Sequence, residues 1–171
     1  MKPFSENIIF FDTEFSSLNP YKGEILSMGL VKFGGEELYL ELLQDCEIDP
    51  WVQKHVVPLL TEPKVTREEA VKKVFAFVGP GRPYMLAYVN QFDALYWYKL
   101  IGGVRDNAFH WIPIDFASIL FAAGKDPQSF DWRRKESIIP GLGIDYAKYR
   151  EHHALDDARF LREVYLKMLK K

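Results

Sequence analysis

The fold of this chain is decided near its start, where the sequence reads Asn7-Ile-Ile-Phe-Phe-Asp-Thr-Glu-Phe15. The apolar run Asn7–Phe11 predicts a short buried strand. Asp12 and Glu14 follow it directly, and residues two apart in an extended chain point to the same face. Both carboxylates can therefore bind ions about 3.5–4 Å apart, the spacing of two-metal phosphoryl-transfer sites. Their hard oxygen donors suit Mg²⁺ or Mn²⁺.

An Asp-x-Glu pair is weak evidence by itself, because composition alone places one in about half of chains of this length. This chain contains a second such pair, Asp45-Cys-Glu47. It lies in a polar connection before Asp49-Pro50, where acids normally cap helices or face water. A solvated pair is thus the alternative for Asp12 and Glu14, and other residues must decide.

Hydrophobic periodicity and turn signals predict alternating β and α elements after the first strand. We expect strands at 24–33, 36–42, 84–89 and 111–114. We expect helices at 49–57, after the capping box Thr66–Glu69, and at 92–100, 116–123 and 155–169. The polar, basic segment Lys125–Pro140 is expected to be an irregular, mobile loop. This order predicts an α/β fold with a mixed central β-sheet flanked by helices.

The bulk composition narrows the class of protein. A chain of 171 residues fits a single domain, 1–171, and its one cysteine, Cys46, excludes an internal disulfide. No stretch approaches the roughly 20 apolar residues of a membrane span. Met1–Phe11 lacks the features of a signal peptide, so we expect a cytoplasmic protein with no membrane partner.

The charge balance bears on how a nucleic acid would be held. The chain has 22 basic and 24 acidic residues, for a net charge of −2. Proteins that grip long duplexes through phosphate contacts tend to be basic, which argues against that mode. It does not argue against an enzyme that takes one strand end into a metal site, where the metals supply the positive charge.

One further acid stands where a predicted strand passes into a helix, in Val89-Asn-Gln-Phe-Asp93. Taken alone, Asp93 is best interpreted as a charge that complements the dipole of the helix. Active sites of open α/β sheets, however, assemble in the loops past the strand C-termini. Its position therefore makes Asp93 a candidate for the same site as Asp12 and Glu14.

A histidine and another acid precede the last predicted helix, in His152-His-Ala-Leu-Asp-Asp157. The simple alternative is an Asp that caps this helix. If His152 lies on the loop and Asp157 on the first turn, they meet at one site. A neutral imidazole can then take a proton from water while Asp157 holds a metal. His110 and Asp115 share the spacing but flank the apolar run Trp111–Ile114, so we interpret both as structural.

Together, Phe11-Asp-Thr-Glu-Phe15, Asn90-Gln-Phe-Asp93 and the His152–Asp157 spacing resemble the motifs of the DEDDh exonucleases of the RNase H-like superfamily. The resemblance spans residues 8–170 and implies an RNase H-like fold. It also implies that two divalent cations, Mg²⁺ or Mn²⁺, are held by Asp12, Glu14, Asp93 and Asp157, with His152 as general base. His153 and Asp156 are each one position away from the motif and inherit no role.

The run Trp51-Val-Gln-Lys-His-Val-Val-Pro-Leu59 narrows the resemblance to the small mycobacterial-type 3′→5′ exoribonucleases. This implies hydrolysis of single-stranded or 3′-overhang RNA from its 3′ end, with release of nucleoside 5′-monophosphates. A 3′→5′ DNA exonuclease of the repair or proofreading type, acting on single-stranded DNA, and a non-catalytic nucleic-acid-binding module of the same fold remain alternatives. His55 in this run is interpreted as a structural or interface residue.

In the superfamily, residues just after the first motif contact the 3′-terminal nucleotides. By resemblance, Phe15 and Leu18 would stack on or wedge against the last base. Phe92 and Met28 are weaker candidates, and core packing is the alternative for all four. The basic run Arg133–Lys135 either follows the substrate backbone or is a solvated surface run. The aromatic content of 15%, together with the resemblance, suggests a homodimer.

Overall fold

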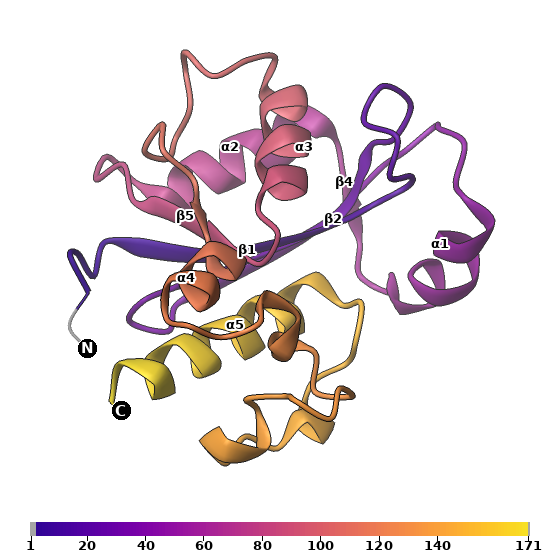
Figure 1. Cartoon of the computed structure of the whole chain (residues 1–171). Helices are drawn as coiled ribbons and strands as arrows, with labels where there is room; N and C mark the ends of the chain where they lie inside the picture. Colours follow the sequence, from indigo (N-terminus) through magenta and orange to yellow (C-terminus); the bar gives the residue numbers. More distant parts are fainter. Residues whose placement is uncertain (1–2, 171) are drawn as a thin grey trace.

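The computed structural model describes residues 3–170, which form a mixed β-sheet covered by helices on both faces (Figure 1). The strand order is β4-β3-β2-β1-β5-β6. The bounds are β1 (Ile8–Phe15), β2 (Ile25–Lys32), β3 (Glu37–Leu42), β4 (Lys64–Val65), β5 (Tyr84–Ala87) and β6 (Ile114–Asp115). β1, β2 and β3 pair antiparallel, whereas β4, β5 and β6 each join their neighbour in parallel. The predicted mixed sheet is confirmed.

The helices divide between the two faces of the sheet (Figure 1). α2 (Arg67–Val78) and α3 (Gln91–Ile101) cover one face, and α4 (Phe116–Ala122) and α5 (Ala154–Leu169) cover the other. α1 (Pro50–His55) packs separately on β2. Short 3₁₀ turns lie at 57–59, 127–130, 140–142 and 146–148. No helix within residues 3–170 is long and apolar enough to cross a membrane.

β1 is apolar on both sides because it lies between two hydrophobic cores. Phe11 faces α3 and makes edge contacts with Trp97 and Phe109 at ring distances of 6.3 and 5.8 Å. Phe10 faces the opposite way and contacts Tyr165 of α5 at 5.4 Å. The strand runs four residues beyond the predicted end at Phe11, since its polar end also pairs with β2.

Most other elements lie within two residues of their expected bounds. The capping box is formed as predicted, with the Thr66 hydroxyl accepting from the Glu69 amide and the Glu69 carboxylate accepting from the Thr66 amide. The predicted strand at 111–114 is wrong, because only Ile114 and Asp115 pair with β5. Pro113 precedes them without an N–H for the sheet, and Trp111 is 69% exposed.

The expected loop Lys125–Pro140 is partly structured. A 3₁₀ turn at 127–130 begins with Asp126, whose side chain accepts from the Gln128 amide. Phe130 packs against Phe116 and Phe160 at ring distances of 5.4 and 5.0 Å. These anchors have no helical or strand period, so the pattern of the sequence did not reveal them. The mobility of this segment stays a prediction.

α5 approaches the sheet over a glycine of β2. Gly29 pairs with Asp12 in the register of β1 and β2. A Cβ at Gly29 would lie 2.3 Å from the backbone oxygen of Ala154 and 2.4 Å from the Cα of Leu155. Only glycine therefore allows the first turn of α5 to lie this close to the strand. Since that turn carries Asp157, Gly29 sets how near Asp157 comes to the acids of β1.

We expect Gly29→Ala to push the first turn of α5 off the sheet, because the atoms that it meets belong to backbone. Overpacking of this kind costs about 1–3 kcal/mol of the free energy of unfolding. Gly141→Ala is the matched control, since a Cβ there meets nothing within 4 Å. Thermal unfolding with and without Mn²⁺ measures both effects. A Gly29→Ala protein that melts like the control and keeps its stabilisation by Mn²⁺ contradicts this role.

Candidate active site

Three carboxylates meet at the end of β1. Asp12 and Glu14 project from the strand to one face, and Asp157 reaches them from the first turn of α5. One oxygen from each of the three lies within 4.8 Å of the others, close enough to hold a cation together. Residues that are distant in the sequence are thus brought together as the motif spacing suggested.

Asp93 enters from the first turn of α3 and is almost fully buried. Its Oδ1 accepts hydrogen bonds from the Thr13 backbone N–H at 2.9 Å and from the Thr13 hydroxyl at 2.8 Å. Asp93 lies outside the group of three whose oxygens share the 4.8 Å limit. Thr13 therefore ties the fourth acid to β1 between Asp12 and Glu14. No sequence pattern pointed to Thr13, although its place between two candidate acids was a signal.

Burial and neighbouring charges raise the pKa values of all four acids. Burial, together with the charges of Asp157, Asp93 and Glu14, holds the pKa of Asp12 well above its usual range. Burial and the charges of Asp157 and Asp93 do the same for the pKa of Glu14. Burial also raises the pKa of Asp93 to about 7 and that of Asp157 to about 7, against opposing hydrogen bonds. A divalent cation would favour the ionised forms, so this hard-oxygen donor set fits Mg²⁺ or Mn²⁺.

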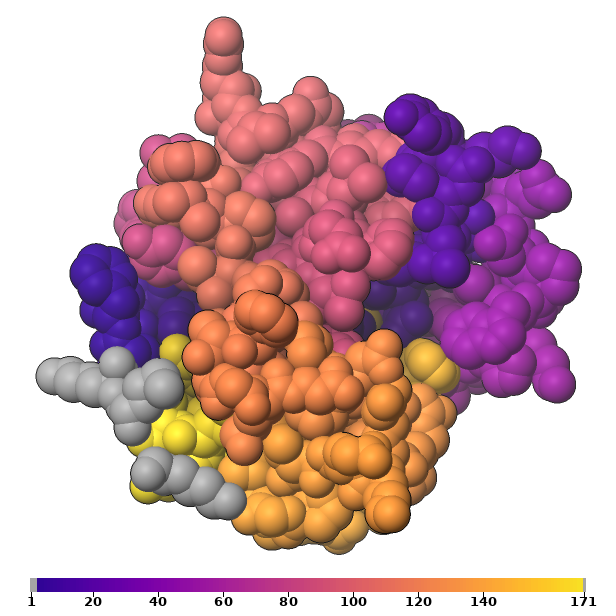
Figure 2. Space-filling model, viewed as in Figure 1, coloured from indigo at the N-terminus to yellow at the C-terminus, as the bar shows by residue number. Residues whose placement is uncertain are grey.

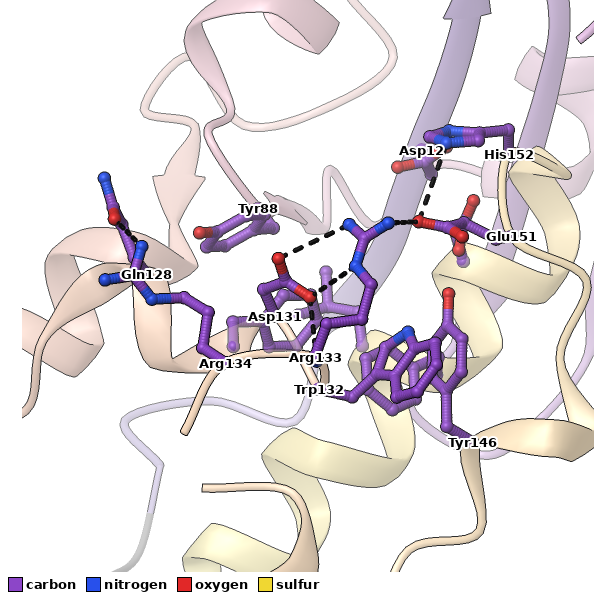
Figure 3. Close-up of a pocket in the computed structure, with 14 residues that line it drawn as sticks. Asp12, Tyr88, Gln128, Asp131, Trp132, Arg133, Arg134, Tyr146, Glu151 and His152 are labelled. Atoms are coloured by element: carbon purple, nitrogen blue, oxygen red, sulfur yellow. Dashed lines mark hydrogen bonds and ion pairs between the residues drawn. The ribbon is translucent and has the colours of Figure 1, made fainter. Parts of the chain in front are cut away.

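His152 lies just before α5 with a φ of 61°, in the left-handed region that costs a residue with a side chain about 1 kcal/mol or more. Its ring lies nearly perpendicular to that of Trp51 at a ring distance of 4.9 Å, and its Nε2 lies 3.6 Å from Oε1 of Glu151. Burial lowers the pKa of His152, so the ring is neutral at pH 7. His152, Asp12 and Asp157 line one cavity (Figure 3).

His153 and Asp156, the neighbours of His152 and Asp157, make contacts outside the acidic group. His153 is buried and stacks on Tyr39 at a ring distance of 4.5 Å. Asp156 forms ion pairs with Arg150 and Arg159, each at 2.7 Å. These contacts fasten the start of α5 to the rest of the fold. They agree with the interpretation that neither His153 nor Asp156 takes the role of its neighbour.

The cavity beside the acids has a volume of about 350 Å³ and is walled by the segment between α4 and α5. In the space-filling view the surface is hollowed where this orange segment approaches α1 (Figure 2). Two ring pairs form much of the wall: Trp132 stacks on Tyr146 at 4.7 Å, and Tyr88 lies on Phe130 at 4.5 Å.

Two members of the basic run Arg133–Lys135 also line this cavity, and both have partners within the chain. Arg133 pairs with Asp131 and Glu151. Arg134 contacts Gln128 and lies 3.8 Å from Asp126. Lys135 is exposed and does not line the cavity. The run is therefore neither simply solvated nor free to follow a substrate without giving up these contacts.

The residues expected to contact the terminal nucleotide differ in exposure. Phe15 stacks on Tyr96 at 4.5 Å and also faces Phe92 at 5.9 Å, and both Phe15 and Phe92 are partly exposed. Leu18 is 66% exposed. Met28 is fully buried in the core between the sheet and α3, as its alternative predicted. Tyr96, to which no sequence pattern pointed, supports the Phe15 ring through this stacking contact.

The two pairs that share the motif spacings, Asp45 with Glu47 and His110 with Asp115, lie outside the acidic group. Asp45 and Glu47 line a separate polar hollow with Arg67. Asp115 caps α4 by accepting from the amides of Ala117 and Ser118. His110 lies on Tyr84 at a ring distance of 4.4 Å. The structural interpretation of His110 and Asp115 is confirmed by these contacts.

His55 is close to His152 but does not line the cavity beside the acids. Its ring stacks on Trp51 at 4.5 Å, and its Nδ1 lies 2.8 Å from the Trp51 carbonyl oxygen. It thereby supports the ring that touches His152. This contact gives His55 a structural part, in agreement with the sequence interpretation.

By sequence, neither a family model nor a characterised protein matches this chain. By structure, it is similar to the nuclease domain of 3′hExo, a DEDDh family member solved with bound rAMP. The two share 13% identity and a TM-score of 0.66, over 95% of this chain and 91% of that chain. The chain therefore has the RNase H-like fold of the DEDDh exonucleases, with an acidic group at the end of β1.

The raised pKa values predict that the metal-free protein loses stability as the pH rises. Unfolded carboxyls titrate near pH 4, whereas Asp93 and Asp157 stay protonated in the folded chain to about pH 7. Between these values the folded state binds more protons, so the free energy of unfolding falls with pH. Added Mn²⁺ should therefore raise the melting temperature more at pH 8 than at pH 6.

Thermal unfolding in EDTA and in Mn²⁺ at both pH values measures this effect. The lowered pKa values of His152 and His153 make stability rise with pH, which is the opposite effect. Comparison with Asp157→Asn, which keeps both histidines, therefore separates the effect of the Asp157 carboxyl from theirs. Wild type should lose more stability than Asp157→Asn between pH 6 and pH 8 in EDTA. Equal losses in the two proteins contradict the raised pKa of Asp157.

Proposed function

We propose that this chain is a metal-dependent 3′→5′ exonuclease that acts on RNA. The observation that carries the proposal is the group formed by Asp12, Glu14 and Asp157, whose oxygens lie within 4.8 Å of one another in the fold of a DEDDh nuclease. His152 on the same cavity adds a neutral base beside the acids. Asp93, fixed by Thr13, completes the predicted set.

Two divalent cations, Mg²⁺ or Mn²⁺, would supply the positive charge that activates water and stabilises the charge of the phosphate. Asp12 would help to hold both cations, because it is close enough to Asp157, Asp93 and Glu14 for their charges to raise its pKa. Glu14 and Asp157 would each complete the coordination from their own element, and Asp93 from α3. The raised pKa values of these acids support this assignment, since crowded carboxyls release protons when cations bind.

In the proposed reaction His152 accepts a proton from the attacking water. The water oxygen bonds to the terminal phosphorus, and the bond from phosphorus to the 3′-oxygen of the preceding nucleotide breaks. That oxygen leaves with a proton from solvent as the new 3′-hydroxyl of the strand. The other product is a nucleoside 5′-monophosphate.

The terminal base would lie on the side of Phe15, Leu18 and Phe92. The loop that carries Leu18 is held to α3, because the Tyr96 hydroxyl donates to the Ser17 carbonyl oxygen and Lys99 donates to that of Gly23. A held loop presents its exposed leucine at a constant place, which suits a wedge against a base. Stacking on these side chains tolerates any base.

RNA is proposed over DNA on the sequence of the run Trp51–Leu59, which forms α1 and the turn after it beside His152. The mycobacterial-type resemblance, a single domain 1–171, a homodimer and a cytoplasmic location belong to the same proposal. The 3′hExo nuclease domain was solved with rAMP, a ribonucleotide, which is compatible with an RNA substrate. A DNA exonuclease and a non-catalytic binding module are the alternatives that the test must separate.

We expect the purified protein to shorten a 5′-labelled single-stranded RNA one nucleotide at a time in Mg²⁺ or Mn²⁺, and to be inactive in EDTA. The DNA strand of the same sequence should be cut more slowly. His152→Ala should lower kcat by about 10²–10⁴, the usual contribution of a general base. Asp12→Ala should also lose its stabilisation by Mn²⁺.

Asp45→Ala is the matched control, because it removes an acid from the second Asp-x-Glu pair, which lies in a separate hollow. Product ladders from both strands record polarity, sugar preference and metal need together. Full activity in His152→Ala contradicts the proposed base. No cleavage of either strand in Mn²⁺ favours the binding module.

A further inference from the structure

A chain of charged side chains runs from the segment between α4 and α5 to His152 (Figure 3). The Arg133 guanidinium binds both oxygens of Asp131, with Nε at 2.9 Å and Nη2 at 3.3 Å. Its Nη1 lies 2.8 Å from Oε1 of Glu151. The same Glu151 oxygen lies 3.6 Å from Nε2 of His152. Arg133 is thus fixed on one acid and holds a second acid beside the histidine.

Stability does not account for this arrangement. The side chains of Arg133 and Glu151 are 56% and 34% exposed, and ion pairs at such exposure contribute little to folding. A guanidinium bound at three nitrogens nevertheless has a fixed orientation, because its donors form a rigid fork. The arrangement therefore fixes the place of the Glu151 carboxylate.

Without its ion pair to Arg133, the Glu151 carboxylate could compete with the other acids for a cation. It lines the same cavity as Asp12 and Asp157, so a further carboxylate stands beside two of the expected metal ligands. An unpaired carboxylate there would be drawn toward any cation that the other acids bind. The contact with Arg133 directs Glu151 toward His152 instead.

His152 in turn needs support from its surroundings. Its backbone is in the left-handed region, which persists only where neighbours hold it. The Trp51 ring lies nearly perpendicular to it at 4.9 Å, and Oε1 of Glu151 lies 3.6 Å from its Nε2. If Glu151 moved from its place, the His152 ring would keep its contact with Trp51 but would lose the carboxylate beside its Nε2.

We propose that Arg133 is a positioning residue: it holds Glu151 against His152 and away from the metal ligands. The inference rests on the proposed function, since it assigns Arg133 a part in that reaction. Arg133 acts through Glu151 and touches neither substrate nor cation. The competing role is a direct contact between Arg133 and a phosphate of the substrate, which a basic residue on this cavity would also suit.

Steady-state kinetics on a 5′-labelled RNA in Mn²⁺ separates the two roles. Arg133→Met should lower kcat about tenfold with KM within about twofold, because substrate binding is untouched. Arg133→Lys should recover part of kcat, since an ammonium still pairs with Glu151. Arg133→Met/Glu151→Gln should be no slower than the slower single variant, because both changes act on one contact.

Arg159→Met is the matched control. Arg159 binds both oxygens of Glu37 and places Nη1 2.7 Å from Asp156, the same pattern as Arg133 but away from the cavity. It should lower the melting temperature without lowering kcat. An equal fall of kcat in Arg159→Met, additive single effects, or a raised KM with unchanged kcat in Arg133→Met would each overturn the positioning role.

Nuclear magnetic resonance tests the role of Arg133 without relying on the proposed activity. The ring resonances of His152, assigned by comparison with His152→Gln, should shift in Arg133→Met and Glu151→Gln but not in Arg159→Met. Unmoved resonances in Arg133→Met overturn the inference whether or not the enzyme cleaves RNA. If wild type is inactive while these resonances move, the proposed function fails and the link from Arg133 to His152 stands.

Discussion

The burial of four carboxyl groups around the end of β1 is the constraint on which the rest of this structure depends. Burial and like charges raise the pKa of each, so the metal-free site holds protons that ordinary acids release. Local contacts offset part of the cost: Thr13 donates twice to Asp93, and both Asp93 and Asp157 lie at helix N-termini, where the dipole favours negative charge. Bound divalent cations would offset the rest of the cost of burying these carboxylates in their ionised form.

The fold brings these groups together by close approaches of backbone. Gly29 lets α5 lie on β2, so that Asp157 comes within reach of Asp12 and Glu14. Two residues with side chains adopt left-handed backbone beside the site: Val89 with φ 59°, between β5 and the helix that carries Asp93, and His152 with φ 61°. Such conformations persist only where surrounding contacts hold them, and here they turn the chain toward the acids.

The sequence predicted those features that arise from local pattern. The apolar run ending at Phe11, the capping box at Thr66 and the same-face placement of Asp12 and Glu14 follow from period and spacing, and the resemblance supplied the RNase H-like fold. Features that depend on contacts between distant elements were not visible: the glycine under α5, the bond from Thr13 to Asp93, and the link from Arg133 through Glu151. The expected strand at 111–114 failed because apolar residues at an exposed edge have the same pattern as a buried strand.

If the acidic group holds two divalent cations, as proposed, the binding of Mn²⁺ should reveal both. Electron paramagnetic resonance counts bound Mn²⁺ per chain in the presence of a nucleoside 5′-monophosphate, for wild type and for Asp12→Asn. Wild type should bind about two ions tightly, as in two-metal phosphoryl-transfer sites, and Asp12→Asn should show a marked loss of binding. Wild type that binds no Mn²⁺, or binds it only as well as Asp12→Asn does, would contradict the proposed two-cation site.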